Sequence, residues 1–317
     1  MPKRKARQAA DPGRLAKRQS LGPLKNLRVS PLALRRYREH ASYFFQWLSM
    51  VAVVGAINTE LDLDLLVQEY VEQLWDHNAG LEAAQSTLAG IQHFLRHAVR
   101  LRGSWRILSV WRRNEPPTRA PPLPEFTLLA LAMHALQCGD VPFAASLLVC
   151  FFAFLRTGEI ITLRVSQCIF DANGHLILNL GQCKSGKRRG EEEYGIIDHP
   201  AVCTILRLFL KHRHPLQTVA GLDEHTWRRR FDKYLGDLGL SHLGLRPYSV
   251  RRGGATSALR KGMTLSQVCV RGRWANERTA RIYIQEAVAL LQNIALPQSV
   301  LDLLLTLASA WQFEFLR

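Results

Sequence analysis

A proline-rich segment divides this chain of 317 residues into two parts. Five prolines lie between Asn114 and Pro124, in the stretch Asn-Glu-Pro-Pro-Thr-Arg-Ala-Pro-Pro-Leu-Pro. Proline lacks an amide hydrogen and has a fixed φ, so neither a helix nor a central strand can run through this stretch. Such a segment behaves as a semi-extended spacer. We therefore predict a linker at 114–124 between a first domain at 30–113 and a second at 125–317, preceded by a basic disordered tail at 1–29.

The first domain has the sequence pattern of amphipathic helices. Ser30 followed by Pro31 is typical of a helix start, because serine caps the amides and proline suits the first turn. Apolar residues then recur every three or four positions, as in Leu34, Tyr37 and Ala41. Helices are predicted at 30–50, 62–77, 81–99 and 104–112, so this domain is entirely helical.

The second domain adds a few strands to a helical pattern. Two apolar runs separated by the turn Asp171-Ala-Asn-Gly174 indicate a hairpin over 168–180, and a third strand is expected at 193–198. Helices are predicted at 125–137, 141–155, 200–212, 223–238, 248–260, 264–271, 276–294 and 297–315. The predicted fold class is mainly α with a small antiparallel β-sheet (α+β). The last helix could cap its own domain or dock on a neighbouring subunit.

The net charge points to a polyanionic partner. Lys and Arg number 42 against 26 Asp and Glu, which gives a net charge of +16. Nine basic residues and Asp11 in 1–29 account for half of that excess, so the remainder is basic as well. Nucleic acid is the expected partner, with an anionic membrane surface as the alternative. Residues 2–7 are either a nuclear import signal or a tail that contacts DNA phosphates. The protein is expected to be nuclear if eukaryotic and cytoplasmic otherwise.

Other chemistries lack their sequence motifs. The six cysteines form no Cys-x-x-Cys pair, which favours reduced thiols in the core over zinc sites or disulfides. No secretory signal is recognisable, and the most apolar run, 141–155, is shorter than the ~18 residues of a spanning helix. Neither a nucleotide-binding glycine loop nor a metal-binding carboxylate cluster is visible, and the run Glu191–Glu193 does not converge on a metal. No cofactor, metal or small-molecule substrate is expected.

Arginines and aromatics form an ordered series in the second domain. Arg156 begins Arg-Thr-Gly-Glu, Tyr248 begins Tyr-Ser-Val-Arg-Arg-Gly-Gly, and Trp274 precedes Tyr283 by nine residues. A guanidinium donates two hydrogen bonds to a phosphate and stays charged, which suits phosphodiester chemistry. Glu159 lies three residues after Arg156 and is expected to orient it. Two successive glycines after Arg252 lower helix stability, which indicates close packing of that helix.

This series resembles the tyrosine recombinase, or phage integrase-like, family. The motif with Tyr248 is most similar to recombinases of DIRS-like and Crypton-like mobile elements. The resemblance covers about 125–295 by motif, and the helical first domain looks like the core-binding domain of the family. It implies a DNA strand-transferase that cuts and rejoins duplex DNA through a 3′-phosphotyrosyl bond, without metal or nucleotide, and acts as a dimer or tetramer on DNA.

The resemblance also assigns roles to residues. The implied catalytic set is Arg156, Lys184, Tyr248, Arg251, Trp274 and Tyr283, supported by Glu159 and Arg252. Tyr283 is the implied nucleophile, Arg156 and Arg251 clamp the phosphate, and Lys184 protonates the leaving 5′-oxygen. Lys187, Arg188 or Arg189 could take the place of Lys184 in the basic loop 181–190. The predicted DNA contacts are Arg35, Arg36, Lys187, Arg188, Arg189 and Arg273.

One position departs from the family pattern. Tyr248 stands where the family usually has histidine, and a phenol cannot act as a cationic proton shuttle near neutral pH. This leaves a rival hypothesis open, a catalytically decayed or domesticated protein that binds DNA without cutting it. A type IB topoisomerase would share the chemistry, but the separate helical domain and the helix after Tyr283 favour recombination.

Overall fold

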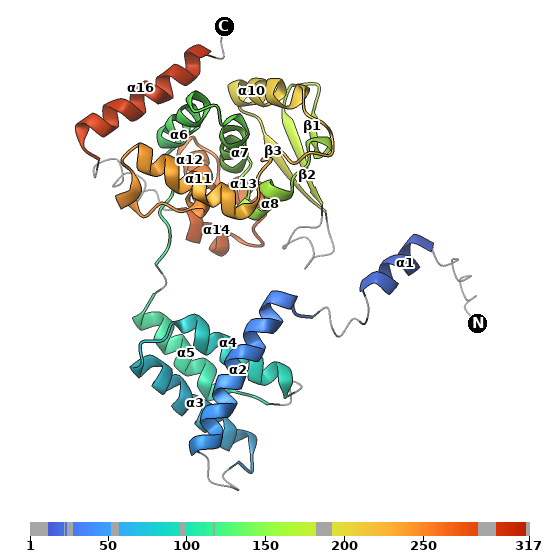
Figure 1. The fold of residues 1–317 in the computed structure, drawn as a ribbon, viewed down its shortest axis with the longest axis vertical. Helices are drawn as coiled ribbons and strands as arrows, with labels where there is room; N and C mark the ends of the chain where they lie inside the picture. The colour runs from blue at the N-terminus through green and yellow to red at the C-terminus, as the bar shows by residue number, and fades with distance from the viewer. Residues whose placement is uncertain are drawn as a thin grey trace. The chain divides into compact units, whose positions relative to one another are not determined.

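The protein is described by a computed structural model over residues 12–21, 23, 28–51, 57–95, 99–116, 118–181, 192–284 and 296–314 (Figure 1). The chain divides into two compact units, Met1–Thr118 and Arg119–Arg317. The division falls inside the proline-rich segment 114–124, where the sequence offers few side chains for either core. Each unit is considered by itself below.

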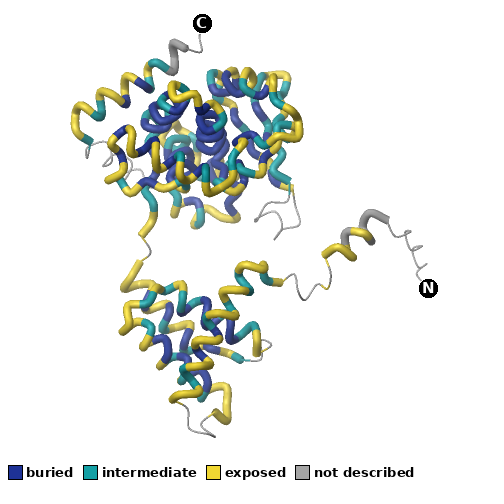
Figure 2. The backbone as a smooth tube through the Cα atoms, in the orientation of Figure 1, coloured by how far each residue is buried: buried dark blue, intermediate teal, exposed yellow. Residues whose placement is uncertain are grey.

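Unit 1 is a helical bundle. It comprises α2 (Pro31–Val51), α3 (Glu60–Asp76), α4 (Leu81–Phe94) and α5 (Arg102–Asn114). Helix α2 packs against α4 and α3 packs against α5. The apolar residues that recur at helical spacing form the shared core, in which Phe44, Val67 and Leu88 have no exposed surface (Figure 2). A capping box starts α3, because Thr59 accepts a hydrogen bond from the Asp62 amide and Asp62 accepts one from the Thr59 amide.

The prediction of disorder throughout 1–29 is wrong for one stretch. Residues Pro12–Leu21 form a helix, α1. Pro12 stands at its first position, where a missing amide hydrogen costs nothing, and the run Leu15–Gln19 has high helix propensity. Net positive charge therefore does not prevent helix formation there.

Unit 2 is also mainly helical and contains the one sheet among the described residues. The sheet has the order β1 (Cys168–Phe170), β2 (Leu176–Gly181), β3 (Glu193–Ile197), and both pairings are antiparallel. Its helices are α6 (Glu125–Gln137), α7 (Val141–Phe152), α8 (Thr157–Thr162), α10 (Pro200–Lys211), α11 (Glu224–Asp237), α12 (Pro247–Arg260), α13 (Leu265–Arg271), α14 (Glu277–Tyr283) and α16 (Gln298–Glu314). The predicted α+β class with a small antiparallel sheet is confirmed.

The apolar helix α7 lies inside unit 2 and organises its core. It contacts α6, α10 and α12, and most of its residues are buried (Figure 2). Helix α16 packs along α6, and Leu304 and Leu307 supply its buried contacts. The last helix therefore covers its own unit in this structure, which was one of the two arrangements that the sequence left open.

Two predicted helices end earlier than expected. Helix α7 stops at Phe152, not at 155, because Phe154 adopts the left-handed backbone conformation (φ 50°) that closes many helices. Helix α14 stops at Tyr283, since Ile284 is already extended, so 276–294 is not one continuous helix. Residues 285–295 lie outside the described ranges. Both helix ends, at Phe152 and at Tyr283, lie close to the candidate site described below.

The two glycines of α12 allow the close packing that the sequence predicted. A Cβ atom at Gly253 would collide with the carbonyl oxygen of Leu123, and one at Gly254 with that of Phe151. The Leu123 amide also donates to the Ser249 carbonyl at 3.0 Å. Helix α12 thus lies directly against the backbone of α7, which fixes the position of the arginine that α12 carries.

Candidate active site

The arginine turn forms the N-terminus of α8. Arg156 is its N-cap residue, and its backbone amide donates to Glu159 Oε2 at 2.9 Å. The Arg156 guanidinium donates to the other oxygen, Oε1, at 2.5 Å. Glu159 does orient Arg156, as predicted, but through a helix cap and not through two positions on one helical face. Gly158 has open space around it and supports no close backbone approach.

Arg251 lies one turn into α12 and is almost completely buried. Its guanidinium donates to the carbonyl oxygens of Phe154 and Gly272, the latter at 2.6 Å. Its Nη1 is 3.8 Å from Glu159 Oε2. Burial, together with the positive charges of Arg273 and Arg156, lowers the pKa of Arg251 to about 10. Because neighbouring positive charges destabilise the charged form of Arg251, an anion bound beside it would be stabilised.

Tyr283 and Tyr248 face one another through their hydroxyl groups. Tyr283 ends α14 and Tyr248 begins α12, and their oxygens are 2.5 Å apart. The Tyr283 ring packs on Trp274, with centroids 4.7 Å apart. Burial and the hydrogen bond to Tyr283 raise the pKa of Tyr248 well above its ordinary value, so its hydroxyl is a neutral donor at physiological pH.

Trp274 completes the cluster from the turn after α13. Its ring lies 4.8 Å from the Arg251 guanidinium, and the Tyr283 ring lies 5.8 Å from the same group. Among the described residues, neither Trp274 Nε1 nor Arg251 Nε has a hydrogen-bond partner, although both are buried. The Nε atoms of Arg252 and Arg273 are likewise buried without a hydrogen-bond partner in the described part of the chain, so several unpaired donors lie in this part of the structure.

Arg252 is buried next to Arg251 and contacts helix α14. Its Nη2 donates to the Ile282 carbonyl oxygen at 3.0 Å. Burial and the positive charge of Arg119 lower the pKa of Arg252. The predicted supporting position of Arg252 therefore corresponds to a contact with the backbone that carries Tyr283.

Arg273 does not occupy the exposed position that a DNA contact requires. It is only 7% exposed, and its guanidinium is 2.8 Å from Glu159 Oε2 and 3.5 Å from Glu193 Oε2. It also donates to the carbonyls of Ala153 and Phe154. We correct the prediction of a DNA contact at Arg273, because its side chain is buried, both of its Nη atoms donate to protein oxygens, and its Nε lies 3.5 Å from a Glu193 oxygen.

Glu193 is a member of this cluster that the sequence analysis missed. It is 3% exposed and begins β3, whose residues 193, 195 and 197 are buried in alternation. The sequence Glu-Tyr-Gly-Ile-Ile carries no signal for this, because the apolar Tyr194 and Ile196 favour the face opposite to Glu193. Only the tertiary structure shows that Glu193 faces Arg273.

The remaining predicted residues lie elsewhere. Arg35 and Arg36 are exposed on α2, and Arg36 forms an ion pair with Glu82. The basic loop residues Lys184, Lys187, Arg188 and Arg189 lie outside the described ranges.

The described residues contain no group of three side chains suited to hold a metal ion. They include five cysteines, at 138, 150, 168, 203 and 269, all of them free thiols. In the part of the chain that the structure covers, no helix is long and apolar enough to cross a membrane.

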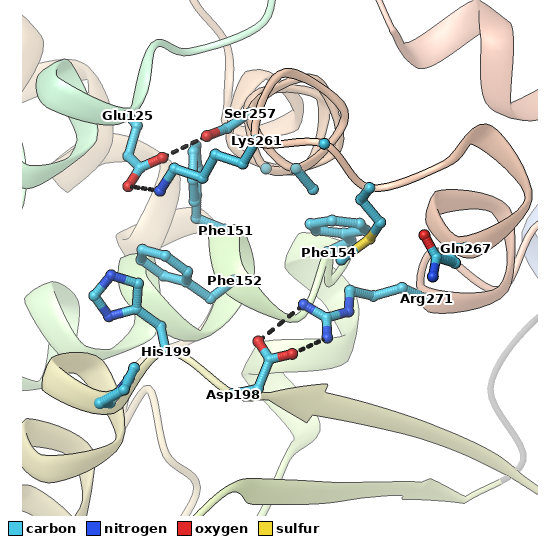
Figure 3. Close-up of a pocket in the computed structure, with 15 residues that line it drawn as sticks. Glu125, Phe151, Phe152, Phe154, Asp198, His199, Ser257, Lys261, Gln267 and Arg271 are labelled. Atoms are coloured by element: carbon cyan, nitrogen blue, oxygen red, sulfur yellow. Dashed lines mark hydrogen bonds and ion pairs between the residues drawn. The ribbon is translucent and has the colours of Figure 1, made fainter.

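A separate cavity of about 490 Å³ lies beside the cluster (Figure 3). Its lining includes three phenylalanines, Phe151, Phe152 and Phe154, and two ion pairs between acidic and basic side chains. Glu125 accepts from Lys261 at 2.6 Å, and Asp198 accepts from Arg271 at 3.0 Å (Figure 3). Neither Tyr248 nor Tyr283 lines it, so this cavity is not the place where the two tyrosines meet.

Comparisons with known proteins agree with the fold. No family model and no curated protein matches the sequence. Among solved structures, the XerH site-specific recombinase bound to palindromic difH substrate has a TM-score of 0.55 at 14% identity, covering 78% of this chain and 75% of that one. The Tn1549 transposon integrase in complex with transposon right-end DNA has a TM-score of 0.55 at 11% identity, covering 89% of this chain and 98% of that one.

A lambda integrase dimer bound to a COC′ core site is similar as well, with a TM-score of 0.52 at 12% identity over 86% of this chain and 76% of that one. Likenesses at such low identity establish a common fold. Together with the mainly helical architecture and three-stranded antiparallel sheet, they show that this chain has the tyrosine recombinase fold.

Proposed function

We propose that the protein is a DNA strand-transferase that cuts and rejoins duplex DNA through a 3′-phosphotyrosyl intermediate at Tyr283. One observation carries the proposal. Residues from four separate segments, Arg156, Tyr248, Arg251, Trp274 and Tyr283, meet in a single cluster in which buried donors are left open. Structural polar groups are normally paired when buried, so unpaired donors at one point indicate a missing ligand.

The charge of the cluster suits one phosphodiester. Ion pairs join three arginines (Arg156, Arg251 and Arg273) to two glutamates (Glu159 and Glu193), and Arg252 is buried beside Arg251, so the described charges are net positive. A phosphodiester carries one negative charge and offers two non-bridging oxygens to guanidinium and indole donors. Binding of the scissile phosphate would therefore offset positive charge in the cluster and supply acceptors for its open donors.

The reaction follows from this placement. Tyr283 gives up its hydroxyl proton to water and its oxygen attacks phosphorus, so that a new P–O bond to tyrosine forms while the bond to the 5′-oxygen breaks. Arg156 and Arg251 stabilise the charge on the non-bridging oxygens as the pentacovalent state forms. Tyr248 can donate its hydroxyl hydrogen to the Tyr283 oxygen and thereby stabilise negative charge on the nucleophile. The 5′-oxygen must gain a proton, which we assign to Lys184, with Lys187 as the alternative. Attack by a 5′-hydroxyl reverses these steps and reseals the strand.

Partners and setting follow from the same proposal. Double-stranded DNA is the substrate, and the excess of basic residues supplies affinity for its phosphates. A site that breaks and exchanges strands requires at least two copies on DNA, so we propose a dimer or tetramer. The motif with Tyr248 supports placement near the DIRS-like and Crypton-like mobile-element recombinases, and the basic segment 2–7 supports nuclear import in a eukaryotic host.

The test is to trap the covalent intermediate. Full-length protein is incubated with a pool of randomised nicked duplexes, in which loss of a short 5′-hydroxyl fragment prevents religation, and adducts are isolated under denaturing conditions. We expect an adduct with the wild type and its complete loss in Tyr283→Phe. Tyr194→Phe removes a hydroxyl from a half-exposed tyrosine of β3 and serves as the matched control, which should retain the adduct.

A rival function has one observation in its favour. Tyr248 occupies the usual histidine position, and it is hydrogen-bonded to the very hydroxyl that must attack. A DNA-binding protein without strand cleavage would show salt-dependent DNA affinity in the same experiment but no adduct from any member of the pool. Adduct formation that persists in Tyr283→Phe would contradict the assignment of the nucleophile.

A further inference from the structure

Arg273 combines two features that are unusual for an arginine. Its side chain is buried, and its backbone has φ 57°, in the left-handed region that disfavours residues with a Cβ atom. Glycine would adopt that conformation without strain. Strained backbone at a buried charge persists only where the surroundings hold it, and such residues cluster at functional sites.

The contacts of Arg273 lead to both site arginines. Glu159 Oε2 accepts from Arg273 Nη2 at 2.8 Å and from the Arg156 amide at 2.9 Å. The Phe154 carbonyl oxygen accepts from Arg273 Nη2 at 3.2 Å and also from Arg251. Phe154 itself has φ 50°, so two left-handed residues meet at one carbonyl group.

Arg273 also sets the charge of the cluster. Its Nε is 3.5 Å from Glu193 Oε2, and its own carboxylate partners are both buried. Without Arg273, the positive charge of the cluster would fall by one and both glutamates would lose a cationic neighbour. Glu159, which already holds Arg156, would remain close to Arg251 and compete with a phosphate for it.

We propose that Arg273 is a positioning residue for the transesterification site, which holds Glu159 and the Phe154 carbonyl so that Arg156 and Arg251 stay aligned, and which offsets the charge of Glu193. The proposal rests on the proposed function at Tyr283. It gives Arg273 no contact with DNA, in contrast to the role expected from the sequence.

The first experiment separates positioning from DNA contact. Arg273→Met should lower the single-turnover rate of adduct formation roughly 10–100-fold, because small displacements of aligned groups are costly to rate. Its DNA affinity should change by less than about threefold. The slope of log affinity against log salt should stay constant, whereas loss of a phosphate contact would reduce it by about 1. Lys211→Met, which removes an exposed charge at the end of α10, is the control and should cleave normally.

Second variants test the two parts of the role. Arg273→Met combined with Glu193→Gln has the same net charge as the wild type and should recover part of the rate, about tenfold. Arg273→Lys keeps the charge but not the planar fork and should give an intermediate rate. If Arg273→Met does not fold, as judged by circular dichroism, Arg273→Gly replaces it, because glycine suits the left-handed backbone.

Hydrogen exchange provides a readout that does not need cleavage. The Arg156 amide donates to Glu159, so Arg273→Met should accelerate its exchange while amides of α16 remain unchanged. Absence of an adduct with the wild type would refute the proposed function, and exchange would still decide the role of Arg273. Unchanged exchange at Arg156, or a defect confined to DNA affinity and its salt slope, would overturn the proposal.

Discussion

Each unit of the molecule contains a buried carboxylate with several partners, and the two differ in the kind of partner: Asp64 in unit 1 accepts from amides and a hydroxyl, whereas Glu159 in unit 2 contacts arginines. In unit 1, Asp64 accepts from the amides of Gly103 and Ser104 at 2.7 and 3.0 Å and from the Ser104 hydroxyl at 2.5 Å. In unit 2, Glu159 holds Arg156 and Arg273 and lies near Arg251, yet a donor of Arg251 stays unpaired.

The difference separates a structural polar group from a functional one. Asp64 lies at the N-terminus of α5, where a negative charge and free amides stabilise one another and nothing remains to be bound. Around Glu159, buried cations outnumber buried carboxylates and the donors of Arg251 and Trp274 await a partner. The contacts of Asp64 therefore stabilise unit 1, whereas those around Glu159 in unit 2 are proposed to bind an anion.

The largest expected effect is at Arg251. Arg251→Met should reduce adduct formation by about 10²–10³-fold, because it removes a donor to the developing charge on the phosphate. The free energy of unfolding should fall by less than about 2 kcal/mol, because burying this cation is itself unfavourable and the Phe154 carbonyl oxygen keeps its hydrogen bond from Arg273. Single-turnover cleavage and urea unfolding measure the two quantities, with Arg260→Met at the exposed end of α12 as the control. A large loss of stability would show that Arg251 is a structural residue like Asp64.

The reverse pattern is expected at Asp64. Asp64→Ala should destabilise unit 1 by about 3 kcal/mol, because buried amides and a hydroxyl lose a charged acceptor. The chemical step at Tyr283 should be unaffected once DNA is saturating. Urea unfolding, followed by tryptophan fluorescence, measures the first effect. Asp76→Ala, at the exposed end of α3, is the control and should stay within about 0.5 kcal/mol. Equal losses in both variants would refute the capping role of Asp64.

The smallest effect is the pH dependence from Glu159. Burial tends to raise the pKa of Glu159, but Arg273, the Arg156 amide, Arg251 and the Arg156 side chain outweigh it and lower that pKa below its ordinary 4.5. A carboxyl whose pKa is lowered by folding stabilises the folded state above the unfolded pKa, and this contribution disappears as pH falls through the folded value.

Glu159→Gln should therefore be less stable than the wild type at pH 7, and the difference should shrink below pH 4.5. Urea unfolding at a series of pH values from 7 to 3 checks this. Glu224→Gln, an exposed residue of α11, is the control and should follow the wild type at every pH. A difference that is constant with pH would mean that Glu159 acts by its hydrogen bonds and not by its charge.

Sequence spacing predicted much of the fold. Helical periodicity located the bundle of unit 1 and the helices of unit 2, and the turn Asp171–Gly174 located the hairpin. Helix ends were predicted less well, because left-handed Phe154 and extended Ile284 depend on packing and not on local propensity. Helix α1 was not predicted, because the net positive charge of 1–29 is typical of a disordered tail and helix propensity is a weak signal in so short a segment.

The sequence alone determined the order and spacing of Arg156, Tyr248, Arg251, Trp274 and Tyr283, because motif residues are local along the chain. Only the tertiary structure decided where the arginines lie relative to the carboxylates. Arg273 lies 2.8 Å from Glu159 and 3.5 Å from Glu193, whereas Arg251 lies 3.8 Å from Glu159 and donates to two carbonyl oxygens. These neighbours come from segments that are distant in the sequence and act in an interior of low polarity, neither of which local spacing encodes.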